Sequence, residues 1–123
     1  MEEFTLQAKA IADPTRVRML KLLENGELCV CHIMEILGLV QSTASKHLGV
    51  LKSAGLVESR KNGTWSYFRL AEKERAYNKA WLAFLESNLG NDGTVKKDRK
   101  RLEKIFSAGD SCNIKKPGKQ KTS

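Results

Sequence analysis

The sequence predicts a mainly helical fold with one small β-hairpin. Apolar residues recur at helical spacing over most of the first 90 residues, and proline and glycine interrupt them at regular points. Between residues 56 and 70 the period changes to two around Asn62-Gly63, which is a strong hairpin signal. A chain of 123 residues suits one compact domain, which we expect over residues 1–90, followed by a basic, largely flexible tail over residues 91–123.

Two helices are expected at the start of the chain. The first covers residues 3–12 and stops at Asp13-Pro14. Asp13 can cap the second helix, whose first position is Pro14, where a missing N–H costs nothing. Asn25-Gly26 ends that helix. Its apolar stripe consists of Val17, Met19, Leu20 and Leu23.

The next two helices form a helix-turn-helix. One runs over residues 28–37 and stops at Gly38, and the other opens at Gln41 or Ser42 and closes at Gly55. The inward positions are Ile33, Ile36 and Leu37 in the first helix and Ala44, Leu48 and Leu51 in the second. The hairpin follows, and its strands hold Val57, Trp65, Tyr67 and Phe68. Together these elements predict a winged helix-turn-helix domain.

A last strong helix is expected over residues 72–89. Its apolar side chains are Ala76, Tyr77, Ala80, Trp81, Phe84, Leu85 and Leu89. They can pack on their own domain, or against a symmetry mate in a homodimer that enlarges a small core. A weak basic helix is expected over residues 95–106, and disorder beyond residue 107.

The charge is concentrated at one end of the chain. Of the net charge of +8, residues 96–123 carry +7, from ten Lys and Arg against three acidic residues. Such a segment is either an arm that contacts nucleic acid or a solubilising tail. The N-terminus resembles no signal peptide and no apolar run could span a membrane, so we expect a cytoplasmic protein without membrane contact. Three cysteines in a reducing compartment favour metal binding or redox sensing over disulfides.

Cys29-Val30-Cys31 is the most distinctive feature of the sequence. Residues i and i+2 of a helix point about 200° apart, so the two sulfurs can chelate one ion only if the helix begins with extended backbone. A helix N-terminus favours thiolates, and thiolates select soft ions such as arsenite, antimonite, cadmium or lead. The alternative to a ligand site is that Cys29 and Cys31 serve only as two small buried apolar residues. We expect His32 on the helix surface and Met34 as core filling.

The second helix of the helix-turn-helix carries candidate DNA contacts. They are Gln41, Ser42, Thr43, Ser45, Lys46 and His47, with Arg60, Lys61 and Arg69 on the wing. Gln41 and Ser42 could instead cap the helix, His47 could be packed, and wing charge could serve solubility. Two copies in a dimer would read double-stranded DNA as an inverted repeat with half-sites about 10 bp, or a multiple, apart.

Several ordered motifs resemble the ArsR/SmtB family of winged-helix metalloregulators over residues 5–90. The motifs are Asp13-Pro14-Thr15-Arg16, Glu27-Leu28-Cys29-Val30-Cys31, Ser42-Thr43-Ala44-Ser45-Lys46-His47-Leu48, Ala54-Gly55-Leu56-Val57 and Arg60-Lys61-Asn62-Gly63. The ELCVC segment is similar to that of arsenite-responsive repressors and of cadmium and lead sensors. Two residues depart from it. Arsenite-responsive members with this motif often have a third cysteine at the position of Met34, and an aspartate is frequent at the position of His32. The chain also lacks the N-terminal cysteines of cadmium sensors and the histidines of zinc sensors.

The resemblance implies a repressor that leaves its operator when trivalent arsenic or antimony binds Cys29 and Cys31. Trivalent arsenic prefers three thiolates, and Cys112 could supply the third from either subunit of the homodimer, or be incidental. Alternatives within the fold are a cadmium or lead sensor and a thiol redox sensor. The sequence contains no phosphate-binding glycine loop and no cluster of catalytic carboxylates, which argues against a thiol enzyme such as an arsenate reductase. The candidate DNA-binding residues argue against a protein that only carries metal. We therefore expect no enzyme activity.

Overall fold

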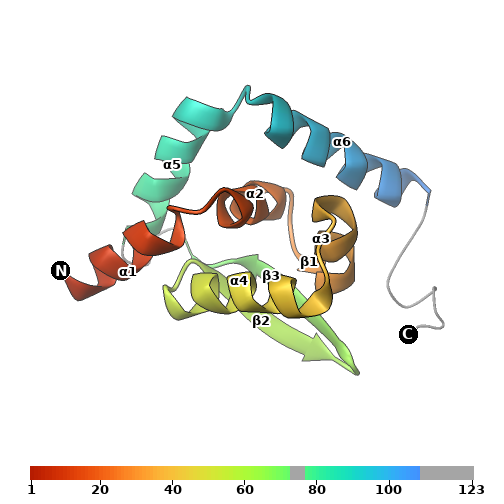
Figure 1. The fold of residues 1–123 in the computed structure, drawn as a ribbon, viewed down its shortest axis with the longest axis horizontal. Coiled ribbons are helices and arrows are strands. Elements are labelled where there is room, and N and C mark those ends of the chain that lie inside the picture. Colours follow the sequence, from red (N-terminus) through yellow and green to blue (C-terminus); the bar gives the residue numbers. More distant parts are fainter. Residues whose placement is uncertain (73–76, 109–123) are drawn as a thin grey trace.

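The computed structural model describes residues 1–72 and 77–108, and Figure 1 shows their arrangement. The elements in chain order are α1 (Glu2–Ala10), α2 (Pro14–Leu23), β1 (Leu28–Cys29), α3 (Val30–Leu37), α4 (Gln41–Ser53), β2 (Val57–Asn62), β3 (Trp65–Leu70), α5 (Asn78–Leu89) and α6 (Gly93–Ser107). Helices α2, α3 and α4 lie against a small sheet, and α5 and α6 form an angled arm on the other side of α2 (Figure 1). This is the expected winged helix-turn-helix architecture.

The sheet has one strand more than the sequence predicted. Its order is β1-β3-β2, all antiparallel, with Leu28 opposite Phe68 and Cys29 opposite Tyr67. The prediction of a helix from residue 28 was wrong for these two residues. Their backbone groups pair with the wing instead, which a single-sequence helical pattern cannot reveal.

The hairpin turn is displaced by one residue from the prediction. Asn62 is the last residue of β2 and pairs with Trp65, so the two-residue turn consists of Gly63 and Thr64. Gly63 has φ 68°, a left-handed conformation that glycine adopts without steric cost. The wing, defined here as β2, β3 and this turn, projects from the body of the domain (Figure 1).

Buried amide side chains join α1 and α5 to the end of α4. The Nε2 group of Gln7 donates to the carbonyl of Ala54 and to Oδ1 of Asn78, at 3.0 and 2.9 Å. Asn78 in turn donates to the carbonyl of Gly55, and the indole of Trp81 donates to Oε1 of Gln7. Because Gln7 and Asn78 are almost fully buried, these bonds also remove a desolvation cost. The last strong helix begins at Asn78 rather than residue 72, and Ala76 lies outside the described residues.

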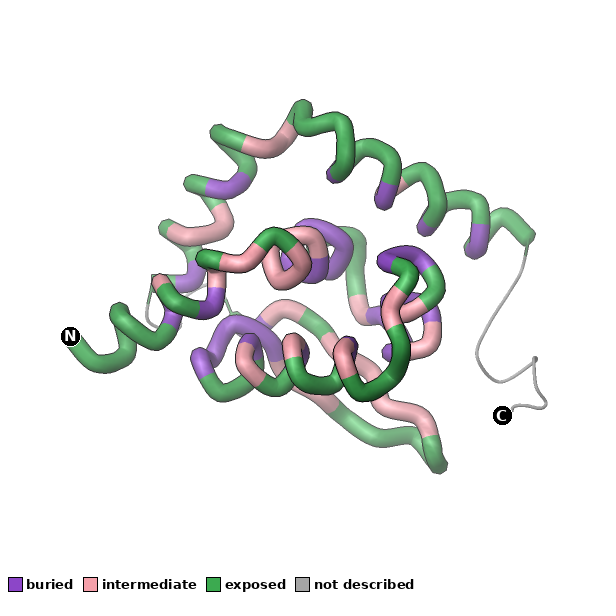
Figure 2. Tube along the Cα trace, viewed as in Figure 1, coloured by how far each residue is buried: buried purple, intermediate pink, exposed green. Residues whose placement is uncertain are grey.

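Helix α6 packs on the domain, although the sequence predicted only a weak helix in a flexible tail. Its inner side is buried while its outer side is exposed along its length (Figure 2). Val95, Leu102 and Ile105 are the buried apolar residues, at helical spacing. The sequence indicated Leu102, Ile105 and Phe106 as the apolar residues of this helix, and the structure buries the first two. Its six Lys and Arg residues favoured a flexible tail, so the packing of α6 on the domain was not predicted.

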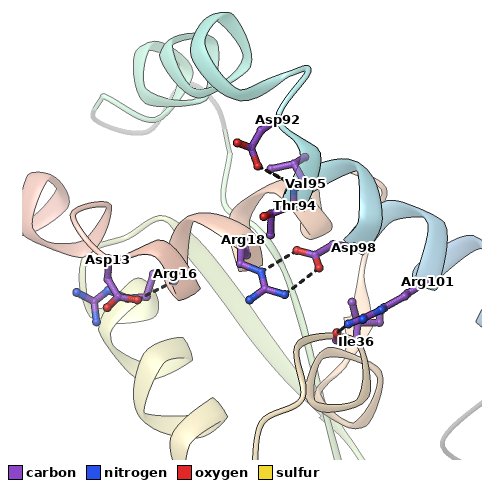
Figure 3. A network of polar contacts seen from close by, with 9 residues as sticks. All are labelled: Asp13, Arg16, Arg18, Ile36, Asp92, Thr94, Val95, Asp98 and Arg101. Atoms are coloured by element: carbon purple, nitrogen blue, oxygen red, sulfur yellow. Dashed lines mark hydrogen bonds and ion pairs between the residues drawn. The ribbon is translucent and has the colours of Figure 1, made fainter.

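Polar contacts fix α6 in place against α2 and α3 (Figure 3). The carboxylate of Asp98, which is 4% exposed, accepts two hydrogen bonds of 2.9 Å from the guanidinium of Arg18 on α2. Arg101 donates to the carbonyl of Ile36 near the end of α3 at 2.9 Å. Asp92 caps the start of α6 through the N–H groups of Thr94 and Val95. None of the helices in the described residues is both long and apolar enough to cross a membrane.

Candidate cysteine site and DNA-binding surface

Cys29 and Cys31 converge at the junction of β1 and α3. Cys29 is the N-cap of α3 with an extended backbone, φ −69° and ψ 143°. The Sγ atoms of the two cysteines lie 2.9 Å apart, and the N–H of Cys31 donates to Sγ of Cys29 at 3.4 Å. The extended start of the helix therefore places both sulfurs on one side, as a shared ligand would require.

The surroundings of the pair are mostly apolar. Cys29 is 2% exposed and belongs to the core, whereas Cys31 is half-buried. His32 is 5% exposed, so the expectation of a surface histidine was wrong. Its ring meets that of Phe106 edge-on at 6.0 Å, because α6 covers this side of α3. Met34 is half-buried and packs against the core.

The pair is mechanically connected to the helix-turn-helix. Ile33 and Ile36 of α3 are fully buried in the same core as Leu48 and Leu51 of α4. Gly38 ends α3 with φ 68°, which turns the chain toward α4. The helix that begins at the cysteine pair and α4 are therefore parts of one packed core.

Within the described part of the chain, no further potential metal ligands join the two cysteines. Among residues 1–72 and 77–108, no three or more His, Cys, Asp or Glu side chains group to hold a metal ion. Cys112, the third predicted ligand, lies outside the described residues. A two-sulfur site suits soft thiophilic ions better than Mg²⁺ or Ca²⁺, which prefer oxygen ligands.

Helix α4 presents most of its predicted DNA contacts to solvent. Gln41, Ser42, Ser45 and Lys46 are exposed and Thr43 is half-buried. The N-cap of α4 is Val40, and no side-chain cap hydrogen bond is formed there. Gln41 and Ser42 therefore do not act as caps in this structure, and their side chains remain available for base edges or phosphates.

His47 lies on the inner side of α4. Its Nδ1 atom is 3.1 Å from the guanidinium of Arg16 and 4.0 Å from the carboxylate of Asp13, and its side chain is 18% exposed. Asp13 also caps α2 through the N–H of Arg16 (Figure 3). These contacts attach the middle of α4 to the start of α2. His47 therefore helps to hold α4 against α2, and it lies apart from the α4 side chains that face solvent.

Two of the three wing cations have carboxylate partners. Arg60 makes hydrogen bonds of 2.7 to 3.1 Å to both carboxylate oxygens of Glu27, and Arg69 pairs with Glu58 at 3.1 Å. The hydrogen bonds from Arg60 lower the pKa of Glu27, with smaller contributions from charge, so that carboxylate stays ionised. Lys61 is exposed near the wing tip.

Glu27 is the residue at this site that the sequence interpretation missed. Glu27 is the first residue of the ELCVC segment, and no sequence pattern indicates that Arg60, 33 positions later, reaches it. The pairing of β1 and β2 with opposite edges of β3 brings the two together, and the pairing of β1 depends on tertiary structure. The short strand at Leu28 was the missing information.

The fold and this surface define a winged helix-turn-helix DNA-binding regulator rather than an enzyme. A sequence model described as "Bacterial regulatory protein, arsR family" matches residues 13–59. The arsenical resistance operon repressor of Escherichia coli is 35% identical over 112 residues, which cover 86% of this chain and 90% of that protein. The chain belongs to the ArsR family.

Other relatives and a solved structure agree with this assignment. An uncharacterized HTH-type transcriptional regulator of Methanocaldococcus jannaschii is 51% identical over 65 residues, 52% of this chain and 73% of that protein. A homolog of a cadmium resistance transcriptional regulatory protein from Staphylococcus aureus is 41% identical over 66 residues, 53% of this chain and 54% of that protein. The homodimeric winged helix-turn-helix DNA-binding domain from Mycobacterium bovis aligns with a TM-score of 0.63 and 35% identity, covering 70% of this chain and 77% of that one.

Proposed function

We propose that this protein is a cytoplasmic transcriptional repressor that leaves its operator when trivalent arsenic or antimony binds Cys29 and Cys31. The observation that carries the proposal is the convergence of two sulfurs at the first turn of α3, the helix that supports α4. The name of the Escherichia coli relative, an arsenical resistance operon repressor, supports the same choice of ligand. Each arsenic–sulfur bond replaces an arsenic-bound hydroxyl, which leaves as water with the thiol proton.

Cys112 is proposed as the third thiolate, from the same or the partner subunit. Helix α6 ends beside α3, where Phe106 contacts His32 and a pocket of about 280 Å³ is lined by Glu35, Ile36 and Ala108, among others. Cys112 is the fourth residue after Ala108, and four residues span at most about 14 Å when fully extended. If Cys112 is a ligand, Cys112→Ser weakens arsenite binding; if it is incidental, this variant binds arsenite as the unmodified chain does.

The ligand would act by changing the start of α3. Pulling two sulfurs onto one ion re-aims the first turn of α3, and Ile33 and Ile36 transmit that change to α4 through the shared core. Modest release from DNA requires a coupling free energy of about 1–3 kcal/mol, and a nearly complete switch requires about 5.5 kcal/mol. The ligand must bind the DNA-free conformation more tightly.

The DNA partner is proposed to be a double-stranded operator with an inverted repeat. The exposed residues of α4 would enter the major groove. Gln41 is the first candidate for a base contact, through hydrogen bonds to an adenine. Arg60, Lys61 and Arg69 would approach phosphates or the minor groove. His47 keeps its place in the proposed set as a residue that orients α4.

A homodimer would be built on α1 and α5. Phe4, Leu6, Tyr77 and Phe84 are between 43% and 58% exposed, and Phe4 lies against the rings of Tyr77 and Trp81 at 5.4 and 5.5 Å. A cluster of aromatic side chains this exposed is typical of a subunit interface. The two helices lie at the same end of the molecule (Figure 1).

A panel of ions tests the choice of ligand. Binding of a fluorescent fragment of the gene's own promoter is measured by anisotropy while arsenite, antimonite, cadmium, lead and zinc are added to the reduced protein in parallel. We expect release by arsenite and antimonite. Release by cadmium or lead alone would instead favour the second candidate function, which the name of the Staphylococcus aureus relative supports. Loss of binding with peroxide but with none of the ions would indicate a redox sensor.

A further inference from the structure

The sheet connects the cysteine pair to the wing by a continuous row of residues. Cys29 lies opposite Tyr67 on β3, and Tyr67 lies opposite Arg60 on β2. Residues directly opposite each other in an antiparallel sheet point to the same face and contact each other. Consistent with this, the guanidinium carbon of Arg60 lies 4.8 Å from the centre of the Tyr67 ring.

The same arginine is tied to the chain next to Cys29 by a second route. Glu27 is two residues before Cys29, and its carboxylate holds Arg60 in a forked arrangement with a shortest distance of 2.7 Å. Such bidentate pairs are directional as well as electrostatic. Arg60 is therefore held from two sides, by the ring of Tyr67 and by the carboxylate of Glu27.

The position of Glu27 sets up a competition for Arg60. When the N–H groups of a guanidinium already donate to both oxygens of a carboxylate, the guanidinium must release or share those hydrogen bonds in order to bind a DNA phosphate. Glu27 also places a negative charge beside the wing, which repels phosphates. The free conformation of the protein thus keeps a wing cation occupied, and DNA has to displace Glu27 to use it.

We propose that the cysteine site controls the wing, and that Glu27 and Arg60 are the residues that carry this control. The proposal rests on the proposed function. A ligand that fixes Cys29 and Cys31 also fixes β1, keeps Glu27 on Arg60 and thereby favours the DNA-free state. By reciprocity, DNA that draws Arg60 away weakens ligand binding by the same factor. This route is additional to the one through α3 and α4.

The wing offers a matched control for this proposal. Glu58 pairs with Arg69 at 3.1 Å, so the same type of ion pair lies on the same wing. Unlike Glu27, Glu58 belongs to β2 and is not adjacent to the cysteine strand. Glu27→Gln and Glu58→Gln remove the same charge from neighbouring places and differ in their connection to β1.

The first experiment measures promoter affinity with and without arsenite in three proteins. Both variants should bind DNA more tightly than the unmodified chain, because each frees an arginine. In Glu27→Gln the factor by which arsenite weakens DNA binding should fall about fivefold, the lower end of usual allosteric couplings. In Glu58→Gln that factor should not change. Where arsenite weakens DNA binding by the unmodified chain, an unchanged factor in Glu27→Gln, or an equal fall in both variants, overturns the role of Glu27.

A second experiment separates this inference from the identity of the inducer. Phenylarsine oxide bridges closely spaced dithiols with loss of water, whatever ion the protein senses in the cell. Amide hydrogen exchange of the reduced, DNA-free full chain is compared before and after a mass-verified adduct forms. We expect changed protection at Tyr67 and Phe68 and in β2, as well as in α3, and a smaller change in β2 in the Glu27→Gln variant.

The outcomes distinguish the two proposals. A change confined to α3, or the absence of any adduct, overturns control of the wing. A change that reaches the wing, together with promoter binding that arsenite does not affect, refutes arsenite as the inducer and supports the connection between the cysteine site and the wing. Release by arsenite with no change in the wing supports the repressor and overturns this inference.

Discussion

At the scale of single residues, the backbone of Cys29 decides what the cysteine pair can do. Its ψ of 143° keeps the residue extended while Cys31 already lies in the helix, and this offset brings the sulfurs to 2.9 Å. The sequence predicted that chelation requires an extended helix start, and the structure has one. The burial of His32 was not predictable, because the α6 residues that cover it are distant in sequence.

Lys21 illustrates how a buried charge can be stabilised in this domain. Its side chain is 2% exposed, and its ammonium group lies 3.0 Å from Glu24 and 2.7 Å from Glu86. Burial lowers the pKa of Lys21, but the hydrogen bonds and charges of Glu86 and Glu24 outweigh this effect and raise it overall. The hydrogen bond from Lys21, and then its charge, lower the pKa of Glu86. The pair therefore connects α2 to α5 in its ionised form.

The lowered pKa of Glu86 predicts a pH-dependent contribution to stability. Its folded pKa lies below the ordinary 4.5, so the contribution is present above pH 4.5 and is lost as pH falls through the folded pKa. Glu86→Gln should therefore reduce the free energy of unfolding at neutral pH, and the difference from the unmodified chain should vanish in acid. Urea unfolding at both pH values measures this. A difference that persists in acid would contradict the ion pair as its cause.

At the scale of elements, the parts of the fold that depend on local pattern were predicted best. Helix α2 begins at Pro14 with Asp13 as its cap, and α3 stops at Gly38, as the sequence indicated. The strand at Leu28 and the packing of α6 were not predicted, because both depend on partners more than 35 residues away. Strand pairing and helix docking are tertiary effects that a single sequence only weakly encodes.

The attachment of α6 predicts a cost for removing Asp98. Asp98→Asn breaks a charged, bidentate hydrogen-bonded pair with Arg18, which is 28% exposed and retains part of its hydration. We expect a loss of about 1–3 kcal/mol in the free energy of unfolding, measured with urea. Glu103→Gln, on the exposed side of the same helix, is the control and should have almost no effect. Equal losses in both variants would show that the ion pair does not fix α6.

At the scale of the whole molecule, the arrangement places three functions on different elements. The aromatic cluster occupies α1 and α5, the candidate DNA contacts occupy α4 and the wing, and the cysteine pair lies at the junction of β1 and α3, at the end of the domain opposite α1 and α5 (Figure 1). Gln7 and Asn78 join α1 and α5, the proposed dimer helices, to the carbonyls that follow α4, so the proposed subunit interface and the end of α4 share one set of hydrogen bonds. The sequence indicated each surface separately, whereas this buried connection emerged only from the structure.

The proposed dimer interface predicts a selective effect of Phe84. Phe84→Ser should weaken self-association at least about tenfold, because burying a phenylalanine side chain contributes about 1.5–3 kcal/mol. Sedimentation equilibrium measures the dissociation constant. Phe106 on α6 is 51% exposed, close to the 58% of Phe84, so Phe106→Ser is a matched control outside the cluster. Weakening of the dimer by the control but not by Phe84→Ser would place the interface on α6.

The proposed function requires that trivalent arsenic at the cysteine pair releases the protein from DNA. The most direct measurement is the affinity for the promoter fragment, with and without arsenite, of the unmodified chain and of Cys29→Ser. We expect that arsenite weakens binding by the unmodified chain, and that Cys29→Ser binds DNA with nearly the same affinity whether or not arsenite is present. A normal arsenite response in Cys29→Ser would contradict the assignment of the site.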